Sequence, residues 1–387
     1  MKDHNKNLVF RTIFECEPIS RVEIARRTRL TRTTVSQIVA ELMQEGLVEE
    51  RGVVSVGVGK PRTMLGINEE ARSFIGVDLS NEVYRGALFD LRGRIRCLVE
   101  WPLRDPQGEG ALAHVFELID ALLATAPSPV LGIGVGTPGL VDIGRGIVHQ
   151  AVNRGWVDLP LKDLLSRRYG LPVYVANDSH MTALAEYRFG AGAGARNLVV
   201  LKIGEGIGSG VVIEGRLLDG DSHAAGEIGH LVVETEGEPC TCGNRGCLET
   251  VASIRALIRQ ARQQAQMNPS SLLATLYRER GTLGLPEVQE ALEQGDIATR
   301  ELVERAGRYL GIAIAAMVSV LDVERVVLGG EGAALGLPLV ESAAAEARRR
   351  ILPRIAERLQ IQLSQLGKEA VILGASAMIM AQVLHLG

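Results

Sequence analysis

The sequence predicts an α/β protein in which an N-terminal winged helix-turn-helix precedes a larger body of two α/β lobes. Two capped amphipathic helices follow each other closely near the N-terminus. Apolar runs then alternate with helical stretches from residue 73 onward. The chain has 387 residues, 46% of them hydrophobic, and is therefore long enough for two or three domains. We expect three segments: 1–68, 69–190 and 191–387.

The N-terminal segment is predicted to begin with three helices. Apolar residues indicate the first of them over residues 8–14. Ser20 and Glu23 have the spacing of a capping box, which predicts a second helix over about 21–28. Thr31 caps a third helix, whose apolar residues recur at helical spacing. Two short helices joined by a tight turn form a helix-turn-helix.

The start of the third helix carries donors that can reach phosphate oxygens or base edges in a major groove. Two strands over 53–56 and 62–67 then predict a hairpin, or wing, in which Lys60 and Arg62 could meet the DNA backbone or the minor groove. A winged helix that docks another protein is the alternative for this segment. The candidate DNA contacts on the third helix are Arg32, Thr33, Thr34, Ser36 and Gln37.

Charge is distributed unevenly along the chain, whose formal net charge is -4. Residues 1–68 hold 11 Lys and Arg against 8 Asp and Glu, a net of +3, whereas the rest holds 31 against 38, a net of -7. This asymmetry favours nucleic-acid binding by the N-terminal segment. The N-terminus lacks an apolar signal core, and the longest uncharged apolar run, 309–321, is too short to span a bilayer. We therefore expect a cytoplasmic protein without membrane contact.

The body is predicted to hold two α/β lobes with a cleft between them. A helix over 111–124 follows the first apolar run, and residues 254–310 have a helical, polar pattern. The second lobe is expected to contain the helices of a dimer interface. The predicted strands lie at 74–79, 130–135, 173–176, 198–201, 211–213 and 326–328.

A cluster of metal-ligand types follows the fifth of these strands. Three of the five cysteines lie within eight positions, and nine residues separate the first of them from a preceding histidine. Three thiolates and one imidazole form a closed tetrahedral set for zinc, and Gly243 and Gly246 let the chain bend around it. The alternative is that the cysteines pack as small apolar side chains. We expect a structural Zn²⁺ held by His230, Cys240, Cys242 and Cys247.

Several motifs of the body resemble the repressor, open reading frame and kinase (ROK) family. ROK repressors also carry an N-terminal winged helix similar to residues 1–68, so the resemblance covers essentially the whole chain. It implies a hexokinase/actin-like, ribonuclease H-like fold whose two lobes hold a sugar. The motifs are Gly136–Asp142, Ala176–Asp178, Gly204–Gly210, Ala225–His230 and the Cys-x-Cys-Gly-x-x-Gly-Cys-Leu-Glu run of 240–249.

The same resemblance implies a sugar site. Carboxylates and amides accept and donate hydrogen bonds in fixed directions, so they can read the hydroxyls of a polyol. One ring nitrogen of His230 would bind zinc while the other would face a sugar hydroxyl. Each residue alone is as consistent with an ordinary surface or capping role; the joint pattern carries the expectation. The matching positions are Asn153, Asn177, Asp178, Glu227, His230 and Glu249.

The loops that hold ATP phosphates in the kinases of this family are altered here. The first loop, residues 78–82, lacks the glycines of the kinase motif and ends in Glu82, and the second has Glu205 where the kinases have threonine. Two carboxylates would repel a polyphosphate. We therefore expect no ATP-dependent phosphorylation and no enzyme, with Asp178, the equivalent of the kinase base, acting as a ligand contact.

Two classes of function follow: a sugar-responsive transcriptional repressor, which we favour, and a glucokinase-like ROK kinase or bifunctional protein. The expected partners are operator DNA, a monosaccharide such as glucose or xylose, and a second copy in a homodimer or homotetramer. Docking to a transport-system protein is compatible with the first class. Sugar is expected to change the spacing of paired winged helices and so to release DNA.

Overall fold

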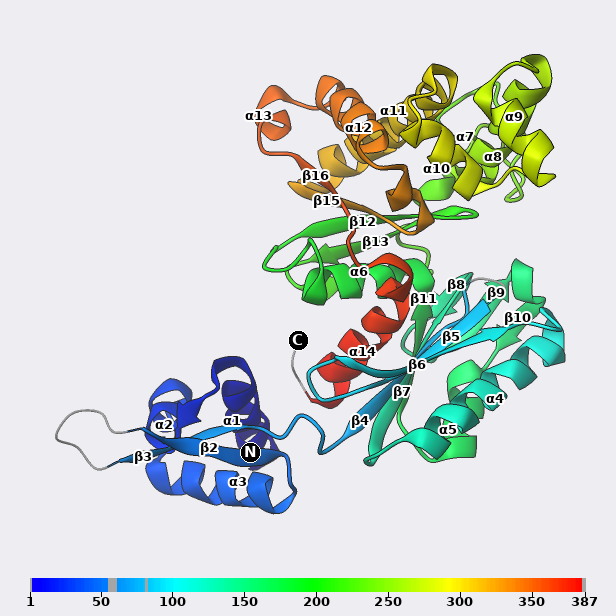
Figure 1. Cartoon of the computed structure of the whole chain (residues 1–387). Helices are drawn as coiled ribbons and strands as arrows, with labels where there is room; N and C mark the ends of the chain where they lie inside the picture. Colours follow the sequence, from blue (N-terminus) through cyan, green and yellow to red (C-terminus); the bar gives the residue numbers. More distant parts are fainter. Residues whose placement is uncertain (1, 55–60, 81–82, 385–387) are drawn as a thin grey trace. The chain divides into compact units, whose positions relative to one another are not determined.

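The computed structural model describes residues 2–54, 61–80 and 83–384, which form two compact units (Figure 1). Unit 1 comprises Met1–Thr137, Arg145–Val175 and Ala375–Gly387, and unit 2 comprises Pro138–Gly144 and Ala176–Gly374. Both units are discontinuous in sequence, whereas the three expected segments are continuous. Among the described residues, no helix is long and apolar enough to cross a membrane.

Unit 1 begins with the expected winged helix (Figure 1). Ile24, Val35 and Leu65 are among its fully buried residues. The tip of the wing, with Lys60, lies outside the described residues. The elements are α1 (Lys2–Cys16), β1 (Ile19–Ser20), α2 (Arg21–Thr28), α3 (Arg32–Gln44), β2 (Val48–Val54) and β3 (Arg62–Ile67), and the strands pair in the order β1-β3-β2.

Two details of the helices in this domain differ from expectation, and the first wing strand begins at Val48 rather than at residue 53. Helix α1 begins at Lys2 rather than near residue 8, because its polar first turns form ion pairs from Lys2 to Glu41 of α3 and from Lys6 to Glu45, the residue that follows α3. The capping box of α2 is only half formed. The Ser20 hydroxyl accepts from the Glu23 N–H at 3.3 Å, but the Glu23 carboxylate binds Arg26 and Arg27 instead of reaching back to Ser20.

A side-chain network joins the winged helix to the rest of unit 1. Arg92, in the turn between β5 (Val83–Phe89) and β6 (Ile95–Pro102), lies 4.1 Å above the Phe14 ring and donates to the Phe14 carbonyl at 2.7 Å. Its guanidinium also pairs with Glu17. The other oxygen of Glu17 accepts from the backbone N–H of Ile67 at 2.5 Å. The hairpin therefore holds the end of α1 and the end of β3.

The larger part of unit 1 is a five-stranded sheet in the order β11-β7-β4-β5-β6. The expected strands are confirmed as β4 (Ser73–Asp78), β7 (Val130–Thr137) and β11 (Val173–Asn177). A Cβ on Gly134 of β7 would lie 2.7 Å from the Ala375 carbonyl oxygen, so this glycine lets α14 approach the sheet. The other elements of this region are α4 (Gly108–Thr125), β8 (Leu140–Asp142), β9 (Ile147–Ala151), β10 (Trp156–Leu159), α5 (Leu161–Tyr169) and α14 (Ala370–Val383).

Unit 2 contains a second five-stranded sheet, in the order β14-β13-β12-β15-β16. In both sheets an antiparallel meander of three strands is followed by a strand that pairs in parallel with the first strand of the meander. This repetition fits the expected pair of α/β lobes. The elements of the second sheet are β12 (Leu198–Ile203), β13 (Ile207–Ile213), β14 (Arg216–Leu217), β15 (Arg325–Gly329) and β16 (Gln360–Leu363).

Helices cover both faces of this second sheet (Figure 1). Leu198 and Val200 of β12 pack with Ala183 of α6 (Asp178–Phe189), and the alternate residues of β12 pack in the cluster of the longer helices. The segment 254–310 is helical as expected, but its apolar side chains form much of this core. The longer helices are α8 (Ile254–Met267), α9 (Leu272–Arg280), α10 (Leu285–Glu293), α11 (Ile297–Leu321) and α12 (Leu337–Arg350), accompanied by the short α7 (Leu248–Ala252) and α13 (Pro353–Ala356).

Candidate functional site

Helix α3 presents the expected recognition face. Val35, Ile38 and Val39 are buried, while Arg32, Thr33, Ser36 and Gln37 on the other side are exposed. Thr34 differs from them because it is half-buried, and its hydroxyl lies 2.8 Å from that of Thr31, whose oxygen also accepts from the Thr34 N–H at 3.1 Å. The Thr34 side chain therefore belongs to the cap of the helix.

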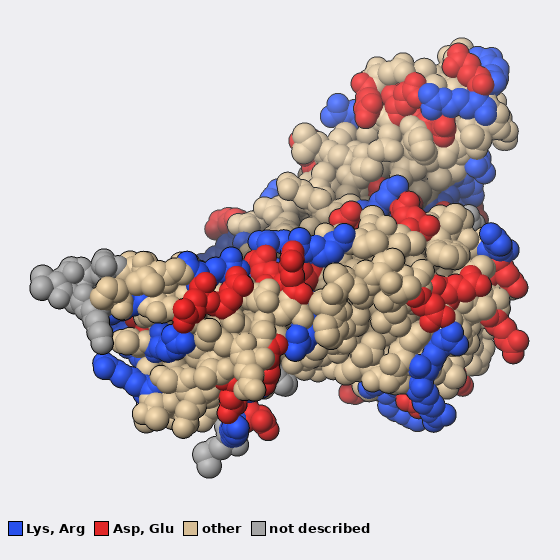
Figure 2. Space-filling view, turned by 60° about the horizontal axis from the view of Figure 1, so that its bottom comes forward, with Lys and Arg blue, Asp and Glu red and all other residues tan. Residues whose placement is uncertain are grey.

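Most basic side chains of the winged helix are paired with carboxylates. On the face seen in Figure 2, basic and acidic side chains are interleaved. Within the described part of residues 2–68, Lys2, Lys6, Arg11, Arg21, Arg26, Arg27 and Arg51 each form an ion pair. Three exposed arginines of that same part have no carboxylate partner: Arg29, Arg32 and Arg62. Their charges are available to a polyanion such as DNA.

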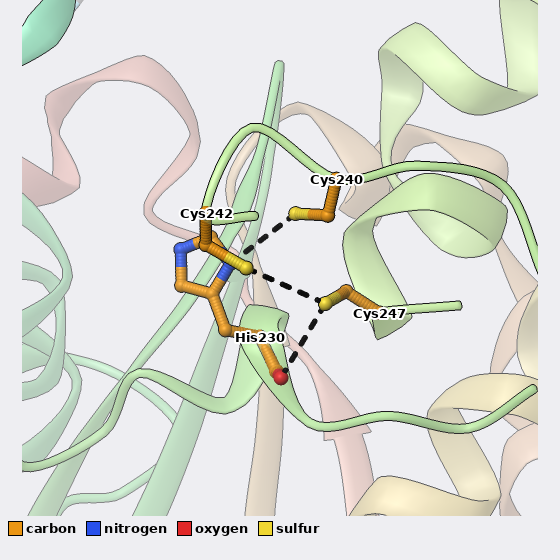
Figure 3. Close-up of side chains that lie close together, drawn as sticks. All are labelled: His230, Cys240, Cys242 and Cys247. Carbon is orange, nitrogen blue, oxygen red and sulfur yellow. Dashed lines mark hydrogen bonds between the residues drawn. The ribbon is translucent and has the colours of Figure 1, made fainter. Parts of the chain in front are cut away.

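In unit 2, one imidazole and three thiols converge (Figure 3). Their ligand atoms all lie within 4.8 Å of one another. His230 ends the turn Ile228–His230, Cys240 and Cys242 lie in the following loop, and Cys247 directly precedes α7. The Sγ atoms of Cys242 and Cys247 are 3.7 Å apart, and Nδ1 of His230 is 3.5 Å from Sγ of Cys240.

These distances fit a tetrahedral zinc ion. Zn–S bonds of about 2.3 Å imply sulfur–sulfur separations of about 3.8 Å in a tetrahedron. The loop is shaped for this set, because Gly246 has a φ of 68° and a Cβ there would lie 1.6 Å from the Glu234 carbonyl oxygen. Gly243 also has a positive φ, of 94°. Burial raises the pKa of the Cys247 thiol to about 12, so a metal would have to displace its proton.

The two ring nitrogens of His230 face different groups. Its Nδ1 faces the sulfurs, whereas its Nε2 lies 3.7 Å from a Glu227 carboxylate oxygen. Glu249 is close to the same cluster, because its carboxylate accepts from Sγ of Cys240 at 3.2 Å. The structure therefore brings His230, Glu227 and Glu249 together, with the nitrogen that is turned away from the sulfurs directed at Glu227.

Asn177 and Asp178 lie at the start of α6. The Asn177 amide caps this helix by accepting from the Ser179 N–H at 2.8 Å, and it donates to the Gly139 carbonyl at 2.8 Å. Asp178 is 8% exposed, and its Oδ2 is 2.6 Å from Nζ of Lys202. Burial raises the pKa of the Glu227 carboxyl, and the negative charges of Asp178 and Glu249 act in the same direction.

Asn153 is the one sugar-site candidate in unit 1. It lies in the turn Val152–Arg154 and is exposed. The other five candidates, namely Asn177, Asp178, Glu227, His230 and Glu249, all belong to unit 2.

In the loop after β4, the backbone N–H groups of the two described residues already have partners. The N–H of Leu79 donates to the Gly136 carbonyl, and that of Ser80 to the Asp78 side chain, each at 2.8 Å. The buried Arg154 donates to the Leu79 carbonyl at 2.9 Å. Glu82 lies outside the described residues. In the second loop, the N–H of Gly204 donates to the Gly206 carbonyl at 2.9 Å, and Glu205 is exposed.

Comparison with known proteins now decides the family. A model of the ROK family matches residues 74–382, and a model of winged helix-turn-helix DNA-binding domains matches residues 2–49. The chain belongs to the ROK family. The match to the second model covers the three helices α1, α2 and α3 described above.

Three relatives show the range of this ROK chain's resemblance. A glucokinase of Halalkalibacterium halodurans is 35% identical, over 80% of this chain and 96% of its own. A xylose repressor of Caldicellulosiruptor bescii is 30% identical, over 99% of this chain and 97% of its own. A crystal structure of a ROK family transcriptional regulator, a homologue of the Escherichia coli MLC protein, is 30% identical and covers 100% of this chain and 97% of that one with a TM-score of 0.88.

Two residues of this ROK protein gain importance only from its structure. Arg29 lies between α2 and α3 and is a cation without a carboxylate partner among the described residues. Lys202 pairs with Asp178, 24 positions earlier in the chain. Arg29 could have been suspected as a basic residue in the turn of a helix-turn-helix. The signal for Lys202 was a single charge in the apolar strand Leu198–Ile203.

Proposed function

We propose that this protein is a sugar-responsive transcriptional repressor. Its winged helix would bind operator DNA through α3 and the wing, and its effector would be a monosaccharide. The observation that carries the proposal combines two features of one chain. The recognition face has arginines without a carboxylate partner among the described residues, and in the ROK body the backbone N–H groups of Leu79 and Ser80, after β4, are already in use. The repressor and regulator relatives span nearly the whole chain, which supports the same class.

In this proposal the DNA contacts are Arg32, Thr33, Ser36 and Gln37 on α3 together with Lys60 and Arg62 of the wing. We add Arg29, and we assign Thr34 to the helix cap. A regulator of this kind binds two half-sites as a dimer, so we propose a homodimer or homotetramer. We also propose that it acts in the cytoplasm, where a bacterial repressor meets its operator DNA.

The sugar would be read by the acids and amides identified above. Carboxylates of Asp178, Glu227 and Glu249 would accept from its hydroxyls, and Nε2 of His230 would meet a further hydroxyl. A Zn²⁺ held by His230 and the three cysteines would fix the ring of His230, which is the one contribution that we assign to the metal. Asn153 is a further candidate sugar contact. Sugar binding by the ROK body would change the affinity of the winged helix for DNA.

A ROK sugar kinase is the second candidate, and the 35% identity to a glucokinase favours it. Asp178 is where such a kinase would hold its general base. Against this candidate stand the occupied N–H groups of Leu79 and Ser80 and the pairing of Asp178 with Lys202.

Thermal shift of the zinc-loaded protein separates the two candidates, because a ligand that binds only the native state raises the melting temperature. We expect a shift with one or a few monosaccharides and none with ATP and magnesium. A shift with ATP and magnesium, accompanied by sugar-dependent release of ADP, would show instead that the protein is a kinase.

A further inference from the structure

Lys202 is the one charged side chain of strand β12, whose sequence is Leu-Val-Val-Leu-Lys-Ile. Because side chains alternate along a strand, Lys202 lies on the same face as Leu198 and Val200, which pack with Ala183 of α6. An apolar residue would extend that packing. A lysine at such a position costs desolvation of its ammonium group, so it calls for an explanation in the contacts that it makes.

The sheet makes room for this side chain. The residues paired with Lys202 on the neighbouring strands are both glycines, Gly208 of β13 and Gly329 of β15. A Cβ on Gly208 would lie 2.3 Å from the Ser179 hydroxyl, and one on Gly329 would lie 3.6 Å from the Thr182 side chain. Both measurements show that the start of α6 lies closely over this part of the sheet. Because neither paired residue has a side chain, the Lys202 side chain has room to extend toward α6.

The ammonium group of Lys202 binds the Asp178 carboxylate. Nζ of Lys202 is 2.6 Å from Oδ2 of Asp178, and the two side chains are 19% and 11% exposed. The Asp178 backbone is held separately, because its carbonyl accepts from the Thr182 hydroxyl at 2.8 Å. Helix α6 has its own cap in Asn177, and a carboxylate in the first turn is stabilised by the helix dipole. The ion pair is therefore not needed to begin the helix.

We propose that Lys202 is a positioning residue of the effector site, an inference that rests on the proposed function. By binding Oδ2, it fixes the plane of the Asp178 carboxylate and leaves Oδ1, to which the Ser179 hydroxyl donates at 3.4 Å, to accept one particular hydroxyl of the sugar. An acceptor held in one direction distinguishes a sugar that carries this hydroxyl from an epimer or deoxy-sugar that lacks it there. Lys202 thus contributes to specificity without touching the ligand.

The test compares variants over a panel of deoxy-sugars. The parent is the monosaccharide that gives the largest thermal shift, and affinities for it and for its single-deoxy analogues are measured by calorimetry. Lys202→Met is expected to lower the affinity for the parent sugar by about tenfold or more, and Asp178→Asn is expected to do the same. Lys202→Arg keeps the charge and should retain affinity to within about threefold. Lys368→Met, an exposed lysine elsewhere in unit 2, is the matched control and should bind like the wild type.

The deciding result is whether Lys202→Met and Asp178→Asn respond to the same deoxy-sugar. If Lys202 acts through Asp178 on one hydroxyl, one deoxy-sugar that lacks this hydroxyl binds the wild type and Lys202→Met with equal affinity. The same deoxy-sugar should then also bind the wild type and Asp178→Asn with equal affinity. If Lys202→Met loses the same factor of affinity for every analogue, Lys202 is a structural residue and the inference is overturned. Unchanged affinity of Lys202→Met for the parent sugar would also overturn the inference. If Lys202→Met does not fold, Lys202→Gln is subjected to the same comparison.

The outcomes also separate this inference from the function on which it rests. Sugar binding by the wild type with no selective effect at Lys202 contradicts the inference alone. Failure of the wild type to bind any monosaccharide contradicts the proposed function, and the inference with it.

Discussion

At the scale of single residues, pairing decides which arginines can contact DNA. Arg26 and Arg27 share the Glu23 carboxylate, whereas Arg32 and Arg62 have no such partner in the described part of the chain. The sequence revealed the basic excess of this segment but not its distribution, because an ion pair such as Lys6 with Glu45 joins residues 39 positions apart.

Arg62→Ala is expected to weaken operator binding and to reduce its dependence on salt. One phosphate contact fewer should lower the slope of log K against log salt concentration by about 0.9. Arg11→Ala removes an exposed charge that is already paired with Glu15 and serves as the control. Titrations of a labelled duplex between low and physiological salt measure both quantities. A slope equal to that of the wild type would exclude a phosphate contact by Arg62.

The metal ligands could be identified from sequence because their spacing is local, yet which nitrogen of His230 faces the sulfurs depends on the ring orientation and had to be seen. Cys242→Ser is expected to abolish binding of one Zn²⁺ per chain and to lower the melting temperature by about 5 °C or more. Cys97→Ser, outside the cluster, should retain the metal.

Zinc content measured by elemental analysis on dialysed protein checks both variants. Release of zinc from the wild type should also increase as the pH falls, because protons compete with the metal for the thiolates, above all at Cys247, whose pKa burial raises to about 12. Full zinc retention by Cys242→Ser would contradict the assigned ligand set.

At the scale of elements, the structure shows which turns depend on glycine. Gly243 and Gly246 both have positive φ, but a Cβ would meet nothing within 4 Å at Gly243 and the Glu234 carbonyl oxygen at 1.6 Å at Gly246. Gly243→Ala should cost about 1 kcal/mol and keep zinc. Gly246→Ala must displace the loop, so it should lose zinc and considerably more stability. Zinc content and melting of the two variants are compared directly, and equal effects would contradict this view of the loop.

The hairpin β5–β6 was not predicted, although β6 shows a regular alternation of half-buried and exposed residues. Its turn holds Arg92 against Phe14 and Glu17. We expect Arg92→Ala to speed hydrogen exchange at the end of α1 and at Ile67 by about tenfold, since a cation–π contact and charged hydrogen bonds are lost. Arg94→Ala, which removes an exposed pair with Glu69, is the control. Unchanged exchange in Arg92→Ala would show that this contact does not hold the winged helix.

At the scale of the whole molecule, the order of motifs predicted the family, the winged helix and the two α/β lobes. It did not predict that residues 138–144 belong with 176–374, or that 375–387 return to the first unit. The unit to which a segment belongs depends on packing between residues far apart in sequence, such as Gly134 and Ala375. The same limit applies to the sugar, because the direction of each hydroxyl-reading side chain is set by contacts such as that of Lys202 with Asp178.

The central claim is that a monosaccharide controls DNA binding by this protein. It is tested most directly by fluorescence anisotropy of a labelled operator, obtained by selecting random duplexes against the zinc-loaded protein, with and without the sugar that stabilises the protein most. We predict that saturating sugar weakens the operator complex by about tenfold or more, a coupling of about 1.4 kcal/mol or more. Operator affinity that is the same with and without every stabilising sugar would contradict the claim.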